Sequence, residues 1–354
     1  MHTKLNELLK KYDGILLTSP HNMRYFSGFS GGEGAVWISN DQRIVFTDSR
    51  YIEQAQKETT AFEVKETNNW QTEICNLKNA KEIGFEDSFL TASLYLSLIE
   101  KLNDARICPI SKELEALRMV KTQEELRVMQ RAEDICCRAF ERILEFIKPG
   151  ISEKTLAAEL EYIIRQEGGD GFSFETIAIS GARCSLPHGV PSEKLIEKGD
   201  FVTMDFGAVV DGYCSDMTRT VVVGKATEKQ REVYNIVKEA QQAGLDFIRA
   251  GVSGRDADKA ARDVVAKYGY GEYFRHSLGH GVGLLVHEQP NLSPKSETIL
   301  GENMVVTCEP GIYIPNFGGV RIEDMVCVKN GGVTNFTHST KELIEIFCFL
   351  QYFC

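Results

Sequence analysis

Two aspartates, Asp205 and Asp216, flank an Asp-Gly pair in a stretch that otherwise has the apolar character of buried strands. Asp-Gly between apolar runs is typical of a two-residue hairpin turn. A turn at residues 211–212 places Gly207 opposite Asp216. Asp205 then lies diagonally across the strand pair from Asp216 and on the same face, with backbones roughly 5 to 8 Å apart.

Such a pair of buried carboxylates must be protonated, paired with cations or bound to metal. Three further residues could complete a metal site: His280 between two glycines, Glu309 before Pro310, and Glu323, which alternation places on one strand face with Arg321. Four carboxylates and one imidazole suit two divalent first-row ions such as manganese, cobalt, iron or zinc. Two ions that activate a shared water and polarise a carbonyl predict metal-dependent hydrolysis.

Each of these residues alone has an ordinary structural explanation. Aspartates decorate turns, buried histidines usually need only hydrogen-bond partners, and glutamates on edge strands prevent unwanted pairing. Only their joint occurrence favours a metal centre. No role is predicted for His276, or for Cys214, which alternation places on the face of Asp216.

The elements that would position these residues differ along the chain. Over residues 1–121, β-rich runs such as GILLTS, GAVWIS and RIVFTD alternate with helical runs, which predicts a small α/β domain. Residues 122–354 form a second predicted domain. There, T-x-x-E and T-x-x-Q capping boxes at Thr122 and Thr227 begin long helices that run to Pro149 and Gly251. Helices segregated from hairpin-like strands predict an α+β fold.

The composition excludes several classes of partner. The 354 residues carry a net charge of -11 and have a pI near 5.3, which argues against nucleic acid or an anionic membrane surface as partner. The polar N-terminus lacks the apolar centre of a signal peptide, so we expect a soluble cytoplasmic protein. Ten cysteines without a C-x-x-C pair predict reduced, mostly buried thiols. The apolar tail, residues 344–354, is too short to cross a bilayer and is predicted to pack on the core or on a partner subunit.

The motifs around the candidate ligands resemble those of the pita-bread metallopeptidases, which include Xaa-Pro aminopeptidases, Xaa-Pro dipeptidases (prolidases) and methionine aminopeptidases. LPHGVPS, DFGAVVDGYCSDMTRT, HSLGHGVGLLVHE, EPGIYI and VRIED follow the family's order and spacing between about residues 122 and 346. The resemblance implies the pita-bread fold for the second domain. It also implies a dinuclear centre, preferably of manganese, with cobalt, zinc or iron as alternatives. The implied ligands are Asp205, Asp216, His280, Glu309 and Glu323, with Asp216 and Glu323 bridging the ions.

Five residues resemble the family's catalytic positions. His188 and His287 match histidines that orient the substrate and stabilise its scissile carbonyl, and Tyr313 and Arg321 match residues beside the metals. Glu309 is predicted to accept the water proton and pass it to the leaving nitrogen. The structural alternatives are loop packing for His188 and Tyr313 and an ion pair for Arg321.

The N-terminal motifs bear on the type of peptidase. YFSGFSGGEGAVWIS and IVFTDSRYIEQA resemble the creatinase-like amino domain of Xaa-Pro aminopeptidases more than that of bacterial prolidases. The resemblance therefore implies an aminopeptidase that acts on peptides with proline second, with Xaa-Pro dipeptidase as the alternative. It also implies a homodimer, because this amino domain often completes a neighbouring subunit's site. A metal-free creatinase-like hydrolase and a non-catalytic binding protein are more distant alternatives, and five unsubstituted ligands weigh against both.

Overall fold

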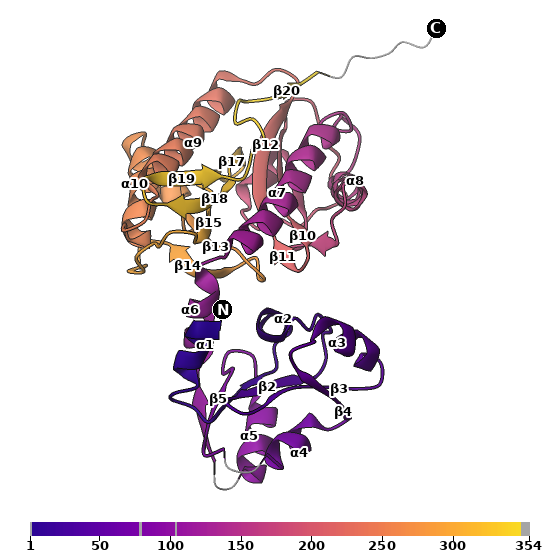
Figure 1. The fold of residues 1–354 in the computed structure, drawn as a ribbon. Coiled ribbons are helices and arrows are strands. Elements are labelled where there is room, and N and C mark those ends of the chain that lie inside the picture. The colour runs from indigo at the N-terminus through magenta and orange to yellow at the C-terminus, as the bar shows by residue number, and fades with distance from the viewer. Residues whose placement is uncertain (1, 78–79, 103–104, 348–354) are drawn as a thin grey trace. The chain divides into compact units, whose positions relative to one another are not determined.

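The computed structural model describes residues 2–77, 80–102 and 105–347 (Figure 1). The chain divides into two compact units, residues 1–118 and 119–354. The part of the predicted apolar tail from residue 348 onward lies outside the described residues. Within the described residues, no helix combines the length and apolar character needed to cross a membrane. The eight cysteines there are free thiols and seven are buried, as predicted.

The first unit is built on a mixed six-stranded sheet in the order β4-β3-β2-β1-β5-β6. Alternate residues of β2 enter different apolar clusters, Val36 and Ile38 with α2 and α3, and Ala35 and Trp37 with α4 and α5 (Figure 1). This arrangement confirms the predicted α/β domain. The strands are β1 (Gly14–Leu17), β2 (Ala35–Ser39), β3 (Arg43–Thr47), β4 (Glu63–Glu66), β5 (Glu82–Phe85) and β6 (Arg106–Pro109). The helices are α1 (His2–Leu8), α2 (Pro20–Ser27), α3 (Ile52–Glu58), α4 (Trp70–Cys75), α5 (Ala92–Lys101) and α6 (Ser111–Met119).

Up to residue 347, where its described part ends, the second unit contains four long helices. They are α7 (Gln123–Ile143), α8 (Glu153–Gln166), α9 (Glu228–Phe247) and α10 (Gly254–Lys267), with 3₁₀ turns η1 (Gly181–Ser185) and η2 (Gly271–Tyr273). Both predicted capping boxes, at Thr122 and Thr227, are present. The predicted helix ends are wrong. The first helix stops at Ile143 because the chain continues in tighter turns, and the second stops at Phe247 because Ile248 is extended and wholly buried.

Among the described residues, the strands of the second unit form antiparallel ladders, apart from the parallel pair of β12 with β20. The sheet orders are β11-β10-β7, β20-β12-β9-β8, β14-β13-β15-β18-β19 and β16-β17. The bounds are β7 (Gly171–Phe172), β8 (Ile177–Ser180), β9 (Phe201–Phe206), β10 (Ala208–Val210), β11 (Tyr213–Cys214), β12 (Met217–Val223), β13 (Gly279–Gly281), β14 (Glu288–Leu292), β15 (Val305–Cys308), β16 (Gly311–Ile314), β17 (Gly318–Arg321), β18 (Asp324–Lys329), β19 (Gly332–Asn335) and β20 (Glu345–Ile346). Helices segregated from antiparallel strands confirm the predicted α+β class.

Each helix pair covers its own strands. Residues of α7 and α8 share an apolar core with β8, β9 and β12, whereas residues of α9 and α10 share one with β15, β16, β17 and β18 (Figure 1). The two halves adjoin where the Thr220 hydroxyl in β12 donates to the Arg321 carbonyl in β17 at 3.1 Å. The carboxylate-bearing strands therefore meet between the helix pairs.

Candidate active site

The first hairpin, β9 and β10 with β11 and β12, carries two of the candidate carboxylates. Its turn, residues 211–212, has φ values of 47° and 76°, as the predicted turn type requires. Val210 pairs with Tyr213 beside the turn, and Asp205 pairs with Thr218 farther away in the same register. The predicted register is therefore confirmed.

A break in this ladder brings the two aspartates together. Gly207 lies at the break, where a Cβ would stand 2.0 Å from the Ser215 carbonyl oxygen, so only glycine allows the strands to approach this closely. Because the register continues, Gly207 lies opposite Asp216 and Asp205 lies diagonally from it. Both aspartates are buried.

The second hairpin, β15 and β16 with β17 and β18, is also interrupted where its carboxylates lie. Pro310 has no N–H to donate, so the ladder cannot continue through it. The pairs that flank the interruption are Cys308 with Asp324 and Gly311 with Arg321. The shared register places Glu309 directly opposite Glu323.

His280 lies in β13 between glycines, next to β15. A Cβ on Gly279 would stand 2.0 Å from the Thr307 carbonyl oxygen, so the glycine permits the close strand approach. The His280 N–H donates to Thr307 Oγ1 at 3.1 Å. Its Nε2 lies 3.5 Å from Asp216 Oδ2 and 3.3 Å from Glu309 Oε1. The imidazole therefore joins carboxylates from both hairpins.

The charges of this cluster are poorly compensated. Burial raises the pKa of Asp216 well above its ordinary value, and the charge of Glu323 raises it further. The pKa of Glu323 is likewise well raised, by burial and by Glu309. Burial would also raise the pKa of Glu309, but the hydrogen bond and charge of His280 lower it to about 2. The pKa values of the two facing glutamates are therefore shifted in opposite directions, because Glu309 has His280 as a partner.

Arg321 is buried beside the cluster. Its Nη2 donates to Asp205 Oδ2, and its Nη1 donates to the Tyr313 hydroxyl at 2.9 Å and to the Pro187 carbonyl at 3.1 Å. The Tyr313 hydroxyl also lies 2.8 Å from His276 Nε2. The ion pair that was the structural alternative for Arg321 is therefore present, with Asp205 as its partner. His276, for which no role was predicted, contacts the Tyr313 hydroxyl.

Two threonines that the sequence reasoning missed also contact the cluster. Thr218 Oγ1 donates to Glu323 Oε2 at 2.6 Å, and Thr307 Oγ1 donates to Glu309 Oε1 at 3.2 Å. Thr307 precedes Glu309 by two residues, so strand alternation could have found it. Cys214, by contrast, packs in a separate apolar cluster, because the ladder break before Asp216 ends the alternation.

A cavity of about 810 Å³ opens onto all five candidate ligands. His188 and His287 also line it, and the His287 ring centroid lies 4.2 Å from that of His280. Burial, followed by the charge of His280, lowers the pKa of His287. The apolar wall of the cavity is formed by Phe174, Ile177, Pro187, Val190 and Pro191.

A buried glutamate at the start of α8 holds the loop that carries His188. Glu153 accepts hydrogen bonds from the Arg183 Nε at 2.9 Å and the Ser192 N–H at 3.0 Å. Arg183 donates in turn to the Val190 carbonyl at 2.6 Å. Both ends of the loop are thereby fixed to one side chain.

Comparison with known proteins identifies the family. Residues 127–330 match metallopeptidase family M24, and residues 3–120 match the creatinase/prolidase N-terminal domain. The chain belongs to metallopeptidase family M24. An Xaa-Pro dipeptidase of Pyrococcus furiosus is 40% identical over 350 residues, which cover 97% of this chain and 100% of the relative.

Solved M24 structures share the fold. An Xaa-Pro dipeptidase from Bacillus anthracis has a TM-score of 0.93 and 46% identity, with 98% of each chain covered. An X-Pro aminopeptidase from Thermotoga maritima has a TM-score of 0.90 and 38% identity, with 97% of this chain and 100% of that chain covered. The predicted creatinase-like domain and pita-bread domain are confirmed.

As an M24 member, the chain is a metal-dependent hydrolase. The carboxylates and the imidazole of the candidate site are ligand types that suit divalent ions. Ligand atoms of Asp216, His280 and Glu323 lie within 4.8 Å of one another. Asp205 Oδ1 is buried, yet it has no hydrogen-bond partner within the described part of the chain. A bound cation would satisfy that oxygen and offset the surplus negative charge.

Proposed function

We propose that this chain is an Xaa-Pro dipeptidase with two divalent metal ions. The observation that carries the proposal is the convergence of four carboxylates and His280 on one cavity, where the buried Asp205 Oδ1 has no hydrogen-bond partner among the described residues. The similarity to two proteins named as Xaa-Pro dipeptidases supports the dipeptidase alternative over the aminopeptidase that the N-terminal motifs favoured.

In this proposal Asp205, Asp216, His280, Glu309 and Glu323 would hold the two ions. Manganese is the first choice, and cobalt, zinc and iron are the alternatives. When bound, the ions lower the pKa of a water and polarise the scissile carbonyl.

The chain's own residues then move the proton and hold the substrate. Glu309 accepts the proton of the attacking water and passes it to the proline nitrogen. His287, close to His280, donates a hydrogen bond to the carbonyl oxygen as negative charge develops there. Arg321 holds Asp205 in place, and Arg321 is itself held by the Tyr313 hydroxyl.

A dipeptidase must also bind the carboxylate of proline. Arg321 already directs four N–H donors to protein acceptors, so it is poorly placed to bind a second carboxylate. We assign this role to His188, which lines the cavity on a loop held by Glu153. The apolar wall, which includes Phe174 and Val190, would contact the proline ring.

Hydrolysis of matched Xaa-Pro dipeptides and Xaa-Pro tripeptides by the manganese-loaded protein tests the proposal. We expect cleavage of the dipeptides and little cleavage of the tripeptides. Release of the first residue from tripeptides would establish the aminopeptidase instead. A protein that neither binds manganese nor hydrolyses either substrate would contradict both and favour a creatinase-like hydrolase or a binding protein.

Three further expectations remain proposals. We propose a homodimer, which light scattering of the purified protein would test against a monomer. A location in the cytoplasm and a domain boundary between residues 121 and 122 complete the proposal, and expression of residues 122–354 alone would test the boundary.

A further inference from the structure

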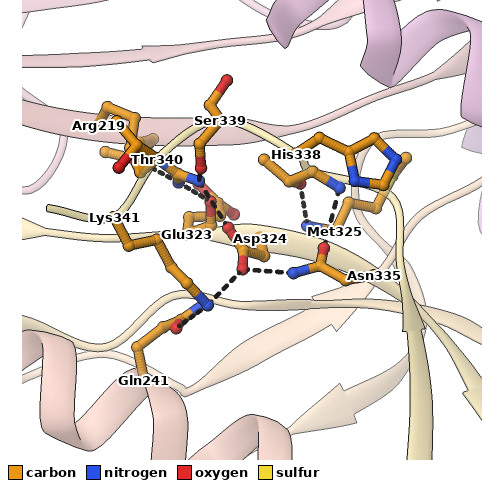
Figure 2. Close-up of polar contacts among 12 residues, drawn as sticks. Arg219, Gln241, Glu323, Asp324, Met325, Asn335, His338, Ser339, Thr340 and Lys341 are labelled. Atoms are coloured by element: carbon orange, nitrogen blue, oxygen red, sulfur yellow. Dashed lines mark hydrogen bonds and ion pairs between the residues drawn. The ribbon is translucent and has the colours of Figure 1, made fainter.

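Arg219, in β12, is a buried arginine whose guanidinium is fully hydrogen-bonded. Only 1% of its side chain is exposed. All five N–H donors reach acceptors on three segments of the chain (Figure 2). The acceptors are the carbonyls of Thr218, Glu323, Ser339 and Thr340 and the Asp324 carboxylate.

Glu323 depends on these contacts because it lies between β17 and β18, outside either ladder. Its N–H donates to the Thr218 carbonyl at 3.2 Å, and its own carbonyl accepts from Arg219 Nη1 at 2.5 Å. Its carboxylate accepts from Thr218 Oγ1. Arg219 and its neighbour therefore fix the backbone and the side chain of Glu323 together.

A C-terminal strap, residues 335–341, also contacts Arg219 and Asp324 (Figure 2). Asp324 accepts from Lys341 Nζ at 3.0 Å and from Asn335 Nδ2 at 2.7 Å, in addition to Arg219. Arg219 also donates to two strap carbonyls, at 2.8 and 3.0 Å. The strap thus bonds to Asp324, the residue next to Glu323, and also to Arg219 in β12, which lies more than one hundred residues earlier in the sequence.

Placing an arginine here has a physical reason. A buried charge is costly unless every donor is paired, and a guanidinium can direct a planar set of donors at carbonyls on different segments. A lysine would keep the charge beside Asp324, but its single nitrogen could not reach the Glu323 and strap carbonyls together. Arginine at this position therefore supplies hydrogen bonds to the Glu323 and strap carbonyls in addition to a charge beside Asp324.

We propose that Arg219, held by the C-terminal strap, is a positioning residue that keeps the Glu323 carboxylate in the geometry required for metal binding. This inference rests on the proposed role of Glu323 as a ligand. Residues that orient metal ligands typically contribute about 10- to 100-fold to metal affinity or activity.

Manganese titration calorimetry of the metal-free protein, combined with its unfolding temperature, tests the inference. Arg219→Lys is expected to weaken manganese binding by about tenfold or more. The matched control is Tyr234→Phe, which removes a buried hydroxyl that donates to the Lys341 and Glu342 carbonyls at the end of the strap. Its manganese affinity should equal that of the wild type.

The outcomes separate the possible explanations. Unchanged manganese affinity in Arg219→Lys, with only a lower unfolding temperature, would show a purely structural role and overturn the inference. Equal losses in Arg219→Lys and Tyr234→Phe would overturn it too, because general strap packing would then explain both. A wild-type protein that binds no manganese would instead refute the proposed function, and this inference with it.

A milder variant covers the case in which Arg219→Lys does not fold. Lys341→Met removes one of the partners of Asp324 while Arg219 stays in place. We expect a smaller loss of manganese affinity in the same direction, with dipeptide hydrolysis lowered in parallel. An unchanged affinity in this folded variant would overturn the role of the strap.

Discussion

Each of the two carboxylate-bearing hairpins contributes one arginine that forms an ion pair with an aspartate of the other hairpin. Arg321 of the second hairpin pairs with Asp205 of the first, whereas Arg219 of the first hairpin pairs with Asp324 of the second. Arg321 lines the cavity, and Arg219 instead contacts the C-terminal strap. One ion pair therefore compensates charge at the site, and the other fixes the backbone behind it.

The hairpins also differ in how they bring their carboxylates together. Gly207 lets the first hairpin set its aspartates diagonally, whereas Pro310 interrupts the second so that two glutamates face each other directly. In the second hairpin, the facing carboxylates have pKa values shifted in opposite directions, because Glu309 has His280 as a partner. Strand register places the two glutamates opposite each other, and contact with His280 lowers the pKa of only one of them.

The largest expected effect follows from removing Asp216, a proposed metal ligand of the first hairpin. Asp216→Ala should lower dipeptide turnover on the order of a thousandfold, because several kcal/mol of metal-dependent stabilisation would be lost. Steady-state kinetics with a metal assay would measure this. Asp211→Asn, which neutralises an exposed acid at the turn of the same hairpin, is the control and should retain activity. Full activity in Asp216→Ala would refute its assignment as a ligand.

The second hairpin is tested by Glu309→Gln, which keeps the shape and removes the charge. We expect kcat to fall about a hundredfold, the scale of a lost proton acceptor. The pKa of His280 in the metal-free protein should also fall, because Glu309 is the main group that raises it against burial. Activity and NMR titration that both match the wild type would contradict the predicted pairing.

Thr218 connects the hairpins, since its hydroxyl contacts Glu323 and Arg321. Thr218→Val should lower kcat about tenfold, as for other residues that orient metal ligands. Thr203→Val, which removes a buried hydroxyl in β9 that contacts Thr220, is the matched control. If both variants lose activity equally, the special position of Thr218 is refuted.

The smallest effect concerns stability and pH. The folded-state pKa values of Asp216, Glu323 and His280 are raised, so their contribution to stability is complete below their ordinary values and is lost as pH rises through the raised ones. Three histidines with lowered pKa values, His21, His276 and His287, oppose this trend below their ordinary pKa. Between about pH 6.5 and 8, the unfolding temperature of the metal-free protein should therefore fall as pH rises. Saturating manganese should remove this decline, because the ions replace the protons. Differential scanning calorimetry with and without manganese measures both trends. Glu133, whose pKa burial raises to about 8, also contributes to the decline, so a metal-free decline that is as steep in Asp216→Asn/Glu323→Gln as in the wild type would contradict this origin.

The sequence predicted the parts of the site that depend on local patterns. Residues 211–212 fixed the turn and thus the placement of Asp205 and Asp216, and two capping boxes located the helix starts. The contacts of Arg219 could not be predicted in this way, because four of its five acceptors lie more than one hundred residues farther along the chain. Helix ends were missed for a related reason, since burial of Ile248 depends on tertiary packing.

The anchoring of the His188 loop by Glu153 separates recognition from chemistry. Arg183 holds the loop through the Val190 carbonyl, which any residue can supply. Glu153 holds it through both the N–H and the hydroxyl of Ser192. The exposed Val190 side chain can therefore vary without disturbing these anchors. Selection, natural or in the laboratory, can exchange side chains of this loop to alter substrate preference while the hydrolytic machinery stays fixed.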